Sequence, residues 1–75
     1  MMQVKVCGLT RQRDIDACRE LGADLAGFIF HPGSPRGLEQ EAAEGLKSPG
    51  LMRVGVFVRH SPREVERIMR RCRLD

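Results

Sequence analysis

Two stretches of this chain carry side chains that could do chemistry, and the first contains Cys7. This cysteine follows a short run rich in valine, residues 3–6, and precedes Gly8. It therefore lies at the carboxyl end of an expected strand, where parallel α/β folds keep their reactive groups. A thiol there can act as a base or nucleophile if nearby helix N-termini favour the thiolate, or it can be a small buried side chain. Lys5 shares its strand face and would point into a barrel interior, adding positive potential or pairing with an acid.

The second candidate is Arg36, in the segment Ser34-Pro35-Arg36. A guanidinium on a loop stiffened by proline is suited to binding a carboxylate or a phosphate through two parallel hydrogen bonds. The alternative is an ordinary solvated arginine. Its position favours a role, because Arg36 follows an expected strand just as Cys7 does. In a barrel these two loops would be neighbours on one rim.

The arginines between Arg63 and Arg73 raise the question of nucleic-acid binding, because basic helices neutralise phosphates. Glu64 and Glu66 are interspersed among them, and the chain has three Phe and no Trp or Tyr to stack on bases. We favour a solvated outer helix face and expect no nucleic-acid partner.

The remaining composition excludes several classes of protein. The cysteines are odd in number and form no CxxC pair, and the histidines have no ligand-like neighbour, which argues against a disulfide framework or a metal site. These residues are Cys7, Cys18, Cys72, His31 and His60. No GxxG follows Gly8, so a dinucleotide cofactor is not indicated either. Without a long apolar run or a signal-peptide layout, we expect a cytoplasmic protein with no membrane partner.

The expected elements alternate between strands and helices. Residues 3–7 are a predicted strand, 11–21 a helix capped by Thr10, and 25–30 an apolar strand covered on both faces. The loop 31–37, a helix over 39–47, a turn at 48–50 and a strand over 52–58 follow. A final helix begins at Ser61, with Pro62 and Glu64 in its capping sequence. The side chains expected to face inward are Ile15, Cys18 and Leu21, then Ala42, Ala43 and Leu46, then Val65, Ile68, Met69 and Cys72.

The order is β-α-β-α-β-α, the layout of a parallel α/β fold with right-handed crossovers. Each βα unit takes about 25 residues, so eight units would need roughly 200, the lower end for a β/α barrel. Three units cannot close a barrel and leave bare strand edges. Residues 1–75 therefore form a single partial domain in this interpretation, a piece of something larger.

Four segments together resemble the N-terminal part of phosphoribosylanthranilate isomerase, in the right order and spacing. They are residues 5–10 (KVCGLT), 22–30 (GADLAGFIF), 34–36 (SPR) and 54–58 (VGVFV). The resemblance implies a (βα)8 TIM barrel of tryptophan biosynthesis, of which this chain is the first three units. It also implies an Amadori rearrangement of N-(5-phosphoribosyl)anthranilate to 1-(2-carboxyphenylamino)-1-deoxyribulose 5-phosphate, without metal or organic cofactor.

The same resemblance implies roles for three residues. Cys7 would be the general base, Arg36 would bind the anthranilate carboxylate, and Gly8 would let substrate and loop approach closely. The family's general acid and its glycine-rich phosphate loops lie on later strands. We therefore expect the chain to need the remainder of the barrel as its partner and to be inactive alone. The alternative is a non-catalytic βα fragment that acts as an assembly or self-association module through its exposed edges.

Overall fold

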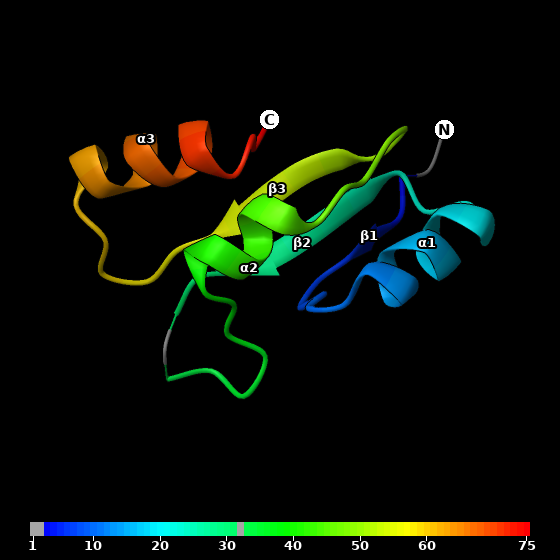
Figure 1. The fold of residues 1–75 in the computed structure, drawn as a ribbon, viewed down its shortest axis with the longest axis horizontal. Helices are drawn as coiled ribbons and strands as arrows, with labels where there is room; N and C mark the ends of the chain where they lie inside the picture. The colour runs from blue at the N-terminus through cyan, green and yellow to red at the C-terminus, as the bar shows by residue number, and fades with distance from the viewer. Residues whose placement is uncertain (1–2, 32) are drawn as a thin grey trace.

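A computed structural model describes residues 3–31 and 33–75 of the chain. Strands and helices alternate along it (Figure 1): β1 Lys5–Val6, α1 Gln12–Glu20, β2 Leu25–Ile29, α2 Gln40–Gly45, β3 Met52–Val56 and α3 Pro62–Arg71. The strands form one parallel sheet in the order β1-β2-β3. The predicted βαβαβα arrangement is therefore confirmed.

All three strands run in the same direction, so their carboxyl ends meet at one edge of the sheet. Lys5 pairs with Leu25 between β1 and β2, and Leu25 pairs with Met52 between β2 and β3. Backbone hydrogen bonds extend the pairing slightly past the strand ends, for example from the Phe30 N–H to the Val56 carbonyl at 3.0 Å. We call this end the carboxyl edge and the opposite end the amino edge.

The helices cover one face of the sheet, and the core lies beneath them. The alternation of strand side chains sends Ala26 and Phe28 of β2 to this side. Both are fully buried, together with Ile15 of α1 and Ala43 of α2, and Ile68 of α3 is almost so. The buried core as a whole is Leu9, Ile15, Ala26, Phe28, Phe30, Ala43, Leu51, Ile68 and Cys72.

The other face of the sheet carries no helix in the part of the chain that the structure describes. The alternation places Lys5, Leu25, Gly27, Ile29, Met52, Val54 and Val56 on it. Met52 is 52% exposed, although it belongs to a sheet strand. We call these residues the bare face.

Arg53 ties the helical layer to β3. Its guanidinium lies 4.8 Å above the Phe28 ring and donates hydrogen bonds to the backbone carbonyls of Ala43, Leu46 and Cys72. Those carbonyls lie at the C-terminal ends of α2 and α3, where carbonyls otherwise lack partners. Burial lowers the pKa of this guanidinium from its ordinary value. An arginine near the start of β3 thus caps two helices.

The start of α3 follows its sequence closely. Ser61 accepts a hydrogen bond from the Glu64 N–H at 3.2 Å, and the Glu64 carboxylate accepts one from the Ser61 N–H at 3.3 Å. Together with Pro62 at the first turn, this is the predicted capping box.

Several local predictions were wrong at element ends. The strand expected over 3–7 is only Lys5–Val6, and α1 begins after Arg11, not after Thr10. Leu21 is 88% exposed instead of inward, because α1 ends at Glu20 and the chain then turns through Gly22 with φ +92°. Gly22 is thus the predicted helix stop, but Leu21 already lies outside the helical periodicity.

The second helix is shorter than the expected 39–47. It ends at Gly45, and Leu46 has an extended backbone. Ala43 is buried and Leu46 is half-buried, but Ala42 is exposed instead of inward. On α3, Ile68 and Cys72 are buried and Val65 is half-buried, but Met69 is exposed. Among the described residues, no helix is long and apolar enough to cross a membrane.

Candidate functional site

Cys7 lies directly after β1, at the carboxyl edge. Gly8 then takes φ +79°, a conformation that side chains disfavour, and turns the chain away from the sheet. The backbone N–H groups of Gly8 and Leu9 both donate to the Gly27 carbonyl, at 3.0 and 3.2 Å. This double hydrogen bond fixes where β1 stops and holds the Cys7 backbone against β2.

The thiol itself packs on a glycine. A Cβ atom placed on Gly27 would lie 3.0 Å from the Cys7 Sγ and 3.1 Å from its Cα, closer than ordinary packing allows. Gly27 therefore makes room for the half-buried Cys7 side chain. Gly27 is not among the site residues predicted from the sequence. An isolated glycine inside an apolar strand is, however, a recognised sign of a close backbone approach.

Arg36 reaches the same place from the loop between β2 and α2. The Ser34 hydroxyl accepts a hydrogen bond from the Arg36 N–H at 3.2 Å, and the Gly37 N–H donates to the Ser34 carbonyl at 2.9 Å. These bonds form a tight turn. From it the Arg36 side chain extends to β1, where its Nη1 lies 3.5 Å from the Cys7 carbonyl oxygen.

Gly8 is the point of contact between the two segments. A Cβ on Gly8 would lie 2.9 Å from Cδ and 3.0 Å from Cζ of Arg36. The glycine thus serves two purposes, since its positive φ turns the chain and its missing side chain admits the arginine. The three residues singled out from the sequence, Cys7, Gly8 and Arg36, are adjacent in the fold.

The three cysteines have different environments. Cys72 is almost fully buried, its Sγ lies 3.6 Å from the Gln40 carbonyl oxygen, and burial raises the pKa of its thiol. Cys18 is half-buried on α1, inside the helical layer. Cys7 alone of the three lies at the carboxyl edge, beside an exposed guanidinium.

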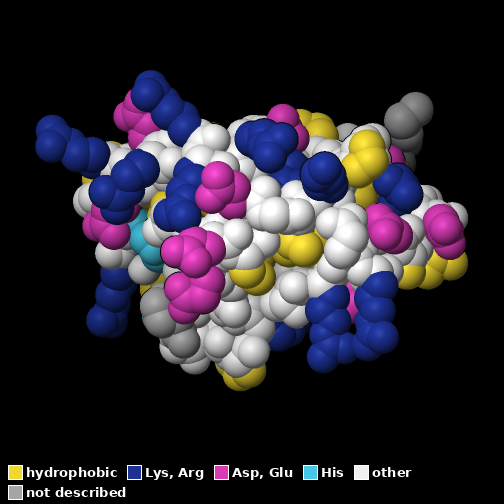
Figure 2. Space-filling model, viewed as in Figure 1, with side chains coloured by type: hydrophobic (Ala, Val, Ile, Leu, Met, Phe, Trp, Pro, Cys, Tyr) yellow, Lys and Arg dark blue, Asp and Glu magenta, His cyan; other side chains and the backbone are white. Residues whose placement is uncertain are grey.

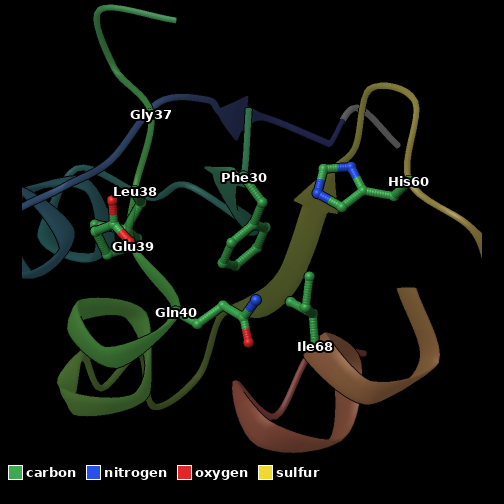
Figure 3. Close-up of a pocket in the computed structure, with 7 residues that line it drawn as sticks. All are labelled: Phe30, Gly37, Leu38, Glu39, Gln40, His60 and Ile68. Carbon is green, nitrogen blue, oxygen red and sulfur yellow. The ribbon is translucent and has the colours of Figure 1, made fainter. Parts of the chain in front are cut away.

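A hollow of about 220 Å³ opens between the helices (Figure 3). Its lining residues are Phe30, Gly37, Leu38, Glu39, Gln40, His60 and Ile68. The Phe30 ring stacks on the Phe57 ring with 5.4 Å between ring centroids, and the His60 ring lies edge-on to Phe57 with 5.2 Å between centroids. This hollow contains neither Cys7 nor Arg36 and lies on the helical side of the sheet. It is therefore separate from the candidate site.

The arginines of α3 belong to a mixed charged surface. Basic side chains gather over α3 with acidic ones between them (Figure 2). Arg70 pairs with Glu66 and Arg71 pairs with Glu44, each at 2.9 Å. This matches the solvated helix face predicted from the sequence. The described residues contain no group of three or more His, Cys, Asp or Glu side chains arranged to hold a metal ion.

Comparison with known proteins identifies the family. The family model of N-(5′-phosphoribosyl)anthranilate (PRA) isomerase matches residues 4–75, nearly the whole chain. The chain belongs to the PRA isomerase family. The PRA isomerase of Desulfovibrio desulfuricans is 51% identical over 74 residues, which are 99% of this chain and 35% of that protein. The PRA isomerase of Solibacter usitatus is 47% identical over 99% of this chain and 37% of its own length. The chain thus spans little more than a third of the relatives it matches.

Solved structures of PRA isomerases have the same fold. The enzyme from Thermus thermophilus superposes with a TM-score of 0.91 at 43% identity, over 99% of this chain and 38% of that one. The enzyme from Thermotoga maritima superposes with a TM-score of 0.94 at 36% identity, over 99% of this chain and 38% of that one. A further PRA isomerase structure, 37% identical with a TM-score of 0.91, holds reduced 1-(o-carboxyphenylamino)-1-deoxyribulose 5-phosphate. The three βα units are therefore the first three of a PRA isomerase barrel.

Proposed function

We propose that residues 4–75 supply the base and the carboxylate-binding group of a PRA isomerase, with the remaining barrel units supplying the acid and the phosphate site. The observation that carries the proposal is the meeting of Cys7 and Arg36 across Gly8 at the carboxyl edge. In β/α barrels this edge is where catalytic side chains are placed.

The chemistry suits these two side chains. PRA carries a carboxylate on its aromatic ring, and two ring carbons, the bridging nitrogen and C1 separate that carboxylate from the sugar C2. A guanidinium that binds the carboxylate therefore holds the sugar C2 a short distance from itself. Cys7 and Arg36 are neighbours that suit this reach, because the Arg36 Nη1 lies 3.5 Å from the Cys7 backbone carbonyl oxygen.

In the proposed reaction the sugar ring first opens as an acid protonates the ring oxygen, which leaves a protonated imine at C1. The Cys7 thiolate then removes the proton from C2. The electron pair of that C–H bond forms the C1–C2 double bond, and the imine π pair moves to nitrogen. Protonation at C1 and loss of the enol proton give the ketose. Atoms and electrons balance without an external oxidant or reductant, and one base and one acid suffice.

A graft tests this proposal directly. Residues 4–75 would replace the matching segment of the Desulfovibrio desulfuricans relative, and PRA turnover would be measured. We expect the graft to be active and Cys7→Ser to lower kcat by about 10²-fold or more, the usual contribution of a general base. Cys18→Ser, on α1, is the matched control and should keep its activity. A Cys7→Ser graft with unchanged kcat would exclude Cys7 as the base.

The carboxylate-binding role has its own measurement. Arg36→Ala should raise KM for PRA, and Arg36→Lys should restore it only in part, because an ammonium cannot form the paired hydrogen bonds of a guanidinium. An unchanged KM in Arg36→Ala would remove Arg36 from the site.

The bare face favours a second candidate function, an assembly module. Leu25, Ile29, Val54 and Val56 are only half-buried on it, and apolar sheet faces left open tend to associate. Sedimentation of the 75-residue chain distinguishes the two. An oligomer that disperses when the remaining barrel segment is added supports the isomerase, whereas an oligomer that ignores this segment supports the assembly module.

A further inference from the structure

The connections at the two edges of the sheet differ in charge. At the carboxyl edge, residues 7–11, 30–39 and 57–61 contain three arginines and one glutamate, a net charge of +2 with the histidines neutral. At the amino edge, residues 21–24, 46–51 and 72–75 contain Lys47 and Arg73 against Asp24 and Asp75, a net charge of zero. Positive charge is thus concentrated at the edge that holds Cys7.

Each connection at the carboxyl edge contributes one arginine: Arg11 after β1, Arg36 after β2 and Arg59 after β3. All three are exposed. Among the described residues the ion pairs are Arg19–Asp16, Arg70–Glu66 and Arg71–Glu44, so none of the three arginines is neutralised by a carboxylate. Basic side chains also project beside the start of α1, near the end of β1 (Figure 2).

Arg59 has an uncommon backbone conformation, with φ +59°. Glycine and asparagine adopt this conformation more readily than arginine. The other such residue, Arg73 with φ +54°, directly follows the last turn of α3, where left-handed residues are frequent. Arg59 follows a strand and has no such explanation.

The turn at Arg59 is held on both sides. The Val58 N–H donates to the His60 Nδ1 at 3.2 Å, the His60 ring lies edge-on against Phe57, and Ser61 begins the capping box of α3. A disfavoured conformation that its surroundings enforce is a reason to look for a function. Here the enforced residue carries a positive charge at the same edge of the sheet as the candidate site.

We propose that Arg59 and Arg11 recruit the substrate of this site, a small anion that bears both a carboxylate and a phosphate, and deliver it to Arg36. The inference rests on the proposed function for the substrate it names. Unpaired charges of one sign around a site raise the local concentration of an oppositely charged ligand, and salt weakens the effect within a Debye length. Arg59 and Arg11 act here through their charge at a distance, whereas Arg36 makes the direct contact.

The test uses the graft described above and two matched variants. Arg59→Asn and Arg73→Asn each remove one arginine from a left-handed position, and asparagine accepts that backbone conformation. Only the first variant changes the carboxyl edge. We expect Arg59→Asn to lower kcat/KM about two- to fivefold at an ionic strength near 10 mM, through KM and not kcat. The difference should vanish near 0.5 M salt, and Arg73→Asn should match the unsubstituted graft throughout.

A binding measurement separates this inference from the proposed function. Titration with reduced 1-(o-carboxyphenylamino)-1-deoxyribulose 5-phosphate reports affinity without turnover, also in a Cys7→Ser background. A low-salt loss of affinity in Arg59→Asn, absent in Arg73→Asn, supports recruitment even if the graft does not isomerise PRA. Equal affinities of the two variants at low salt overturn the inference even if the graft is fully active. Adding Arg11→Gln to Arg59→Asn should deepen the low-salt loss.

Discussion

The two faces of the sheet are built from alternate residues of the same strands, yet they have opposite surroundings. On the helical face, Phe28 is fully buried and Arg53 caps two helices across its ring. On the bare face, Met52 is half-exposed and Leu25 and Ile29 are only partly covered. Cys7 projects on the bare face and Arg36 meets it at the edge. The helical face thus holds the buried core of these three units, and the bare face carries the thiol of the candidate site.

The largest expected effect tests the difference between the two faces at two neighbouring residues of β2, one on each face. Phe28→Ala should lower the free energy of unfolding by about 3–5 kcal/mol in both the 75-residue chain and the graft, because it empties a buried site. Ile29→Ala should cost less than about 1 kcal/mol in the chain alone, but about 2–4 kcal/mol in the graft, where a closed barrel buries the bare face. Urea titrations of all four proteins measure this. Equal costs for Ile29→Ala in both backgrounds would show that the bare face is not a closing surface.

An intermediate effect is expected at Arg53. Arg53→Met keeps the length of the side chain but leaves the carbonyls of Ala43, Leu46 and Cys72 without their donors, at a cost of about 2–3 kcal/mol. Hydrogen exchange should also increase at the ends of α2 and α3. Arg67→Met is the control, because Arg67 is exposed and makes no hydrogen bond or ion pair within residues 3–31 and 33–75. Similar costs for both variants would contradict the capping role.

The smallest expected effect is the loss of stability at low pH that the Glu64 carboxylate causes. Hydrogen bonds from the Ser61 backbone N–H and from the Ser61 side chain hold the pKa of Glu64 below its ordinary value of 4.5. A lowered folded-state pKa stabilises the fold above the unfolded-state value, and this contribution is lost as pH falls through the folded-state value. Between pH 6 and 3 the unsubstituted chain should therefore lose more stability than Glu64→Gln. Parallel pH profiles would show that the carboxylate contributes nothing to the cap.

The sequence predicts the fold best where an element depends on residues close together in the chain. The apolar runs around residues 25–30 and 52–58 identified parallel strands, because buried parallel strands lack alternation. The capping box at Ser61 and Glu64 depends on residues three apart and was predicted to the residue. Element ends were less predictable, since the exposure of Leu21 depends on where α1 stops.

Arg53 shows what sequence could not supply. Its carbonyl partners lie at the ends of two helices, α2 and α3, and become neighbours only when these helices pack. The candidate site was predictable to the same extent. The positions of Cys7 and Arg36 after strands suggested both residues, but their contact across Gly8 and the packing of Gly27 on Cys7 depend on the tertiary structure. The roles of Cys7, Gly8 and Arg36 stay predictions until the graft is assayed.

Gly27 has a consequence for how such a protein tolerates mutation. It has no side chain to take part in a reaction, yet a Cβ on it would lie 3.0 Å from the Cys7 Sγ. Its carbonyl also accepts the hydrogen bonds of Gly8 and Leu9, which follow Cys7. In a selection for growth that depends on PRA isomerase activity, we therefore expect Gly27→Ala to be depleted, because it displaces the thiol that we propose as the base. An inventory of reactive groups would overlook this glycine, whereas a scan of every position would test it.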